Sequence, residues 1–130
     1  FMDSPAGLGD GFQLAMAAAD RAIVVSATDP AALRDAQRTV TELLPRVHEI
    51  HLVMNRVQPK LMRQLRTSID HAMDTAGLPL LGIIPEDRQV TVAAGQGTPL
   101  VLYTHKGAAV SYLNIARRLL GTKVPLMRIH

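Results

Sequence analysis

The chain contains three short runs of almost continuous apolar residues, and each run predicts a strand that is buried on both faces. The runs cover residues 22–26, 50–54 and 80–84, and turn-forming or polar residues follow each of them. Uninterrupted Val, Ile and Leu residues are typical of strands in parallel sheets, because helices cover both faces of such sheets. A further apolar pair, Phe1-Met2, predicts the end of another buried strand, which stops abruptly at Asp3.

Segments with a helical spacing of apolar residues separate these runs. The segment 31–44 carries apolar residues on one face, with Asp29 as a plausible N-cap and Pro30 at the first helical position. Further helices are predicted over residues 12–19, 59–76, 88–94 and 106–120, whereas 99–102 is ambiguous. Strands that alternate with helices predict an α/β fold, a parallel sheet with helices on both faces.

The amino-acid composition limits the kinds of binding and metal site that this fold can contain. The 130 residues are 48% apolar, enough for one domain with a substantial core over 1–130. The chain has no cysteine, which excludes disulfides and cysteine-based zinc sites, and its five histidines show no metal-ligand spacing. The net charge of +3 comes from dispersed lysines and arginines, so we expect no nucleic-acid partner.

Polar residues follow the predicted strands at the edge where α/β proteins bind ligands. Asp3 follows the first run, and there an Asp can help to hold Mg²⁺, as in P-loop nucleotide hydrolases, or only start a turn before Pro5. Asn55 can both donate and accept hydrogen bonds, as the edge of an adenine ring requires, or can cap a turn. Arg56 can stack on a base or pair with a phosphate, or be exposed. Asp87 is a candidate for the ligand crevice or for a helix N-cap.

Six stretches can be compared together with known motifs. They are DSPAG at 3–7, ADRAIVV at 19–25, LRDA at 33–36, VMNRV at 53–57, LGIIPED at 81–87 and IARRLLG at 115–121. In this order and spacing they resemble the MinD branch of the ParA/MinD family of deviant Walker A ATPases. The resemblance covers nearly the whole chain and implies a P-loop NTPase-like fold, with this chain as its carboxy-terminal half.

The resemblance also assigns roles to individual residues. It implies that Asp3 acts near Mg²⁺, directly or through water, that Asn55 contacts adenine, and that the backbone of Pro85, Glu86 and Asp87 closes over the ring. ATP and Mg²⁺ are therefore the cofactors expected for the complete protein.

The family resemblance further implies partners. Its members sandwich the nucleotide between two subunits, and Asp29 falls where the family carries an acidic residue facing the partner subunit. Asp35 falls on a surface that the family uses for regulator proteins. The implied function is ATP-driven dimerisation that positions the division site of a bacterium, in a cytoplasmic protein that associates peripherally with the membrane.

Two departures from the family limit what this chain alone is expected to do. The deviant Walker A loop with its phosphate-binding lysines would lie upstream of Phe1, so the first residue is not expected to be the natural start. The family's amphipathic membrane helix is missing after residue 125, since the tail is too short to form one. We therefore expect the complete protein to be an ATPase, and this chain to be inactive alone and not to bind membrane.

Several alternatives remain open at this point. A related family member that sets flagellar number or matures a metal cofactor would carry similar motifs. A non-catalytic interaction module could pair through an exposed sheet edge. A flavodoxin-like or response-regulator domain is a weaker fit, because no cluster of phospho-acceptor aspartates follows the strands.

Overall fold

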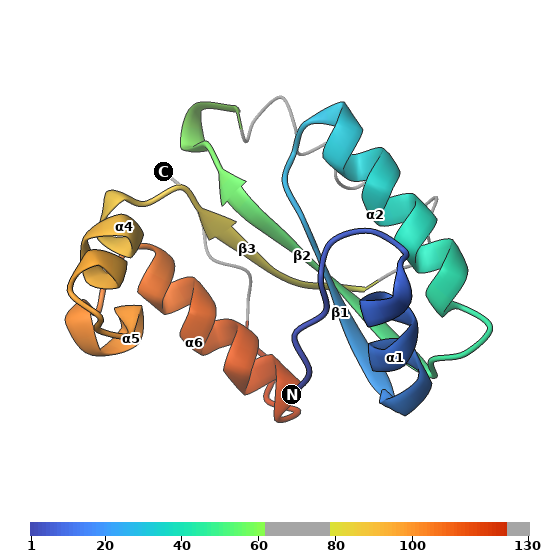
Figure 1. Ribbon diagram of the computed structural model, residues 1–130. Coiled ribbons are helices and arrows are strands. Elements are labelled where there is room, and N and C mark those ends of the chain that lie inside the picture. The colour runs from blue at the N-terminus through green and yellow to red at the C-terminus, as the bar shows by residue number, and fades with distance from the viewer. Residues whose placement is uncertain (62–78, 125–130) are drawn as a thin grey trace.

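The computed structural model describes residues 1–61 and 79–124 (Figure 1). The elements in chain order are α1 (Asp10–Ala18), β1 (Arg21–Ser26), α2 (Pro30–Leu43), β2 (Glu49–Val57), a 3₁₀ turn η1 (Pro59–Leu61), β3 (Leu80–Pro85), α4 (Arg88–Gly95), α5 (Leu100–Tyr103) and α6 (Ala108–Leu119). The three strands expected from the apolar runs are thus confirmed.

The strands form one parallel sheet in the order β1-β2-β3. β1 pairs with β2 without interruption from Arg21↔Glu49 to Ser26↔Met54. The pairing of β2 with β3 is less regular, with a shift in register between Met54 and Val57. Because all three strands run in the same direction, their carboxyl ends share one edge of the sheet, as the predicted α/β fold requires.

Two apolar clusters lie on opposite faces of this sheet, because successive side chains of a strand point to opposite faces. The larger cluster joins β1 and β2 to α1 and α2, with Met54 and Val57 fully buried in it. The smaller cluster joins Val53 and β3 to α6. Figure 1 shows α2 and α6 on the two sides of the sheet, which confirms the prediction of helices on both faces.

The helix boundaries are set by capping residues that can be recognised in the sequence. The Asp29 carboxylate accepts a hydrogen bond of 3.0 Å from the Ala32 N–H and caps α2, with Pro30 in the first turn as predicted. At the end of α6, Gly121 adopts a left-handed φ of 89°. The Thr122 N–H then bonds to the Arg117 carbonyl at 2.9 Å, which closes a Schellman motif.

One predicted strand is wrong. Residues 1–5 form no strand, and Phe1 and Met2 are exposed, by 117% and 53%. A strand exists only where a neighbour pairs with its backbone, and β1 is hydrogen-bonded on one side only, to β2. Of the helix predicted over 59–76, only the start is described, as η1, and residues 62–78 lie outside the described part.

The prediction that each strand is buried on both faces is wrong for β1, which is covered on one face only. Ile23 and Val25 are 37% and 59% exposed, since α6 packs on β3 and β2 rather than on β1. No helix within residues 1–61 and 79–124 is long and apolar enough to cross a membrane.

Candidate functional site

The end of β2 carries an irregular backbone at the two residues that the sequence singled out. Arg56 adopts a left-handed φ of 54°, which is uncommon outside glycine and costs about 1–2 kcal/mol. The Asn55 side-chain oxygen accepts a hydrogen bond of 2.9 Å from the Arg56 N–H and so supports this conformation. The Asn55 carboxamide is thereby fixed in orientation, and its NH₂ group can still donate to a ring-nitrogen acceptor.

The end of β2 meets the loop that follows β3 at this point. The Glu86 N–H donates to the Val57 carbonyl at 2.9 Å, and the Arg56 guanidinium lies 3.6 Å from the Glu86 carboxylate. Both of these charged side chains are largely exposed, so the ion pair contributes little stability. The structure thus brings together Asn55, Arg56 and the Pro85–Asp87 loop, as the shared edge of parallel strands predicts.

Asp87 acts as a helix N-cap. One carboxylate oxygen, Oδ1, accepts a hydrogen bond of 2.9 Å from the Gln89 N–H and caps α4. The other, Oδ2, accepts one of 2.9 Å from the Ala108 N–H at the start of α6, twenty-one residues further along the chain. The capping role considered for Asp87 is therefore confirmed, and it extends to a second helix that local sequence does not reveal.

The other candidate residues lie outside this group of contacts. Asp3 is exposed in the irregular segment before α1, and Asp29 and Asp35 are exposed at the start and on the surface of α2. No cluster of three or more His, Asp or Glu side chains that could hold a metal ion occurs among the residues whose placement is described. Mg²⁺ bound to a nucleotide needs only one or two protein carboxylates, with phosphates and water completing its shell, so a single Asp is compatible with it.

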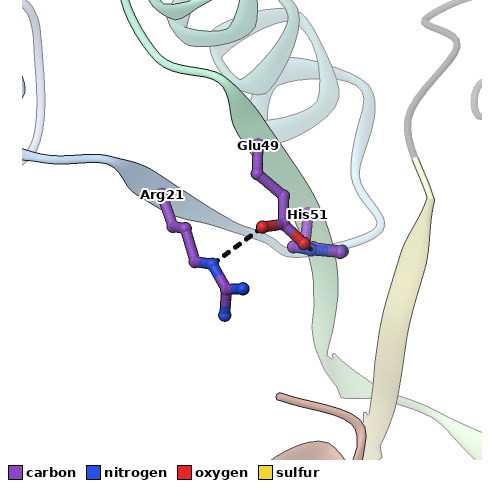
Figure 2. A network of polar contacts seen from close by, with 3 residues as sticks. All are labelled: Arg21, Glu49 and His51. Carbon is purple, nitrogen blue, oxygen red and sulfur yellow. Dashed lines mark hydrogen bonds and ion pairs between the residues drawn. The ribbon is translucent and has the colours of Figure 1, made fainter. Parts of the chain in front are cut away.

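A polar network lies at the opposite edge of the sheet, where β1 and β2 begin (Figure 2). Glu49 accepts from His51 at 2.8 Å and from Arg21 at 2.7 Å. The hydrogen bond from His51, and then the charge of Arg21, hold the pKa of Glu49 below its ordinary value of 4.5. Glu49 and His51 are neighbours on one face of β2, whereas Arg21 reaches Glu49 only through the β1–β2 register, which the sequence did not reveal.

Comparison with known proteins finds relatives and solved structures named MinD. The septum site-determining protein MinD of Bacillus subtilis is 38% identical over 128 residues, which cover 96% of this chain and 48% of that relative. The MinC:MinD cell division protein complex of Aquifex aeolicus contains a chain that superposes with a TM-score of 0.87 at 30% identity, over 98% of this chain and 53% of the other. By sequence and by fold, this chain is similar to part of the MinD proteins.

The match is to part of those proteins, since the chain spans about half the length of the MinD relatives it matches. A MinD of Pyrococcus horikoshii, solved in complex with Mg-ADP, shares the fold with a TM-score of 0.74 at 24% identity, over 94% of this chain and 52% of that one. No model of a known protein family matches the chain.

Proposed function

We propose that this chain is the carboxy-terminal half of a MinD-like ATPase that binds ATP, dimerises and positions the cell-division site. The observation that carries the proposal is the contact between the end of β2 at Arg56–Val57 and Glu86, at the carboxyl edge of the sheet. Ligands bind at this edge in open α/β sheets. The similarity to MinD of Bacillus subtilis supports the same role.

In this proposal the chain supplies the base-binding side of the nucleotide site. The Asn55 NH₂ group donates to an adenine ring nitrogen, while the backbone of Pro85 to Asp87 covers the ring. Arg56, which is exposed and has a left-handed φ near the end of β2, lies at the rim of this site, where it can stack on the base or pair with a phosphate. The Mg-ADP bound by the Pyrococcus horikoshii neighbour is consistent with these assignments.

Asp3 is assigned to the phosphate side. As an exposed carboxylate it can accept hydrogen bonds from Mg²⁺-bound water or ligate the ion itself. Mg²⁺, when bound, would offset the negative charge that develops on the phosphate oxygens. The lysines that cradle these phosphates in the family are expected upstream of this chain, so catalysis requires both halves.

The partner surfaces follow from the same family assignment. Asp29 would face a second subunit in the ATP-bound dimer, and Asp35, exposed on α2, would face a regulator protein. The complex of MinC with MinD in Aquifex aeolicus supports a regulator of this kind. The complete protein would be cytoplasmic and would associate peripherally with the membrane.

ATP turnover tests the proposal. The isolated chain is expected to release no phosphate from ATP, whereas the same chain extended upstream through a Walker A loop is expected to do so with Mg²⁺. Asp3→Asn in the extended protein should lower turnover by about 100-fold, by analogy with the loss of one charge-stabilising group at an active site. Turnover by the isolated chain, or a fully active Asp3→Asn variant, would overturn the assignment of parts.

A further inference from the structure

Asp87 holds two helices with one carboxylate. Its two oxygens each accept a 2.9 Å hydrogen bond, one from the first turn of α4 and one from the first N–H of α6. Hydrogen bonds from backbone N–H groups to an ionised carboxylate are among the stronger ones, and the positive ends of both helices favour the negative charge. The last residue of the candidate base-binding loop is therefore fixed from outside the loop.

Gly107 makes the second of these bonds possible. Its φ of 60° and ψ of −130° form a backbone conformation that side chains other than glycine disfavour. A Cβ atom built on Gly107 would also collide with Oδ2 of Asp87. The close approach between α6 and the carboxylate thus depends on the absence of a side chain at this position.

α6 is itself held in place along β3 by contacts that do not involve Asp87. Gly82 has no side chain, so Ile115 of α6 packs directly on the strand backbone. At the far end of the helix, the Arg118 guanidinium donates to the Leu81 carbonyl at 2.7 Å. The start of α6 is therefore a fixed point relative to β3, against which Asp87 can hold the loop.

We propose that Asp87 is a positioning residue for the nucleotide base, which sets the height of the Pro85–Asp87 backbone over the ring through its bonds to α4 and α6. This inference rests on the proposed function and adds to it the residue that controls the affinity for the base. Both carboxylate oxygens are engaged, so Asp87 acts through the loop backbone and not by contact with the base. Its loss should weaken recognition of the base and leave recognition of phosphates unchanged.

The test compares two ligands in the protein extended upstream through the Walker A loop. Asp87→Ala should raise the Kd for ATP roughly tenfold, or about 1.4 kcal/mol. Its Kd for inorganic tripolyphosphate, which lacks a base, should stay unchanged. Gly107→Ala, which keeps the carboxylate but displaces it, should show the same selective loss. Asp87→Asn retains one acceptor oxygen and should lose affinity for ATP by about threefold.

A matched control separates positioning from stability. Val40→Ala removes buried methyl groups from the cluster on the opposite face, and should lower the unfolding midpoint without changing either Kd. Equal losses for ATP and tripolyphosphate in Asp87→Ala, or no loss for ATP, would overturn the positioning role. If the wild-type protein binds no ATP, the proposed function fails instead. In that case hydrogen exchange of the Gln89 and Ala108 amides still tests whether Asp87 caps the two helices. The caps are refuted if both amides exchange as slowly in Asp87→Ala as in the wild type.

Discussion

Replacement of Gly82 by alanine tests how closely α6 lies on β3. A Cβ atom at this position would lie 2.8 Å from Cδ1 of Ile115 and closer still to Cγ1, whereas carbon atoms pack best at about 3.5–4.0 Å. Ile115 is only 9% exposed, so it has little room to withdraw. Overpacking of this kind costs about 1–3 kcal/mol, and the lower entropy of the unfolded alanine chain offsets about 0.4–1 kcal/mol of it. We expect Gly82→Ala to destabilise the chain by about 1–2 kcal/mol.

Urea unfolding of four chains measures this quantity as a double-mutant cycle: the wild type, Gly82→Ala, Ile115→Ala and the double variant. Ile115→Ala alone should cost about 2–4 kcal/mol, because it leaves a cavity. In the double variant the new methyl group enters that cavity, so the two losses should fall short of additivity by at least about 1 kcal/mol. Additive losses, or a Gly82→Ala chain as stable as the wild type, would refute the close packing of helix on strand.

Two further substitutions test local features of the sheet edges. Arg56→Gly should stabilise the chain by about 0.5–1 kcal/mol in urea unfolding, because glycine adopts the left-handed φ without strain and the exposed ion pair lost is weak; a destabilised variant would contradict this reasoning. Glu49→Gln tests the depressed pKa of Glu49: its stabilising effect is present above the ordinary value of 4.5 and is lost as the pH falls through the folded pKa. The difference in unfolding midpoint between wild type and Glu49→Gln should therefore be largest above the ordinary value of 4.5 and shrink as the pH falls through the folded pKa, and a constant difference would contradict the network.

The sequence predicted well those elements that are determined by residues close together in the chain. The apolar runs at 22–26, 50–54 and 80–84 form strands as predicted, although only β2 and β3 are covered on both faces. Asp29 followed by Pro30 marks the start of α2, since an oxygen acceptor and a fixed φ are both needed within one turn. In these cases the residues that determine an element lie within it or directly beside it in the sequence.

The features that sequence could not predict depend on distant partners. The strand expected at Phe1-Met2 is absent, because apolar character favours a strand but cannot supply the neighbour that pairs with it. The left-handed φ of Arg56 has no local signal, since arginine does not favour that conformation. The ion pair of Arg21 with Glu49 forms only when β1 and β2 take their register.

Asp87 combines a feature that local sequence predicts, the cap of α4, with one that depends on a distant partner, the bond to α6. The sequence presented a helix cap and a place in the ligand crevice as competing roles, and the structure confirms the cap. The two roles are compatible if the loop recognises the base through its backbone, because a carboxylate that holds two helix N-termini leaves the backbone of Pro85 and Glu86 rigid and available. On this argument, base affinity depends on the distance between two helices as much as on any residue that touches the base. It should therefore respond to a change as remote as Gly82→Ala in β3, which displaces α6.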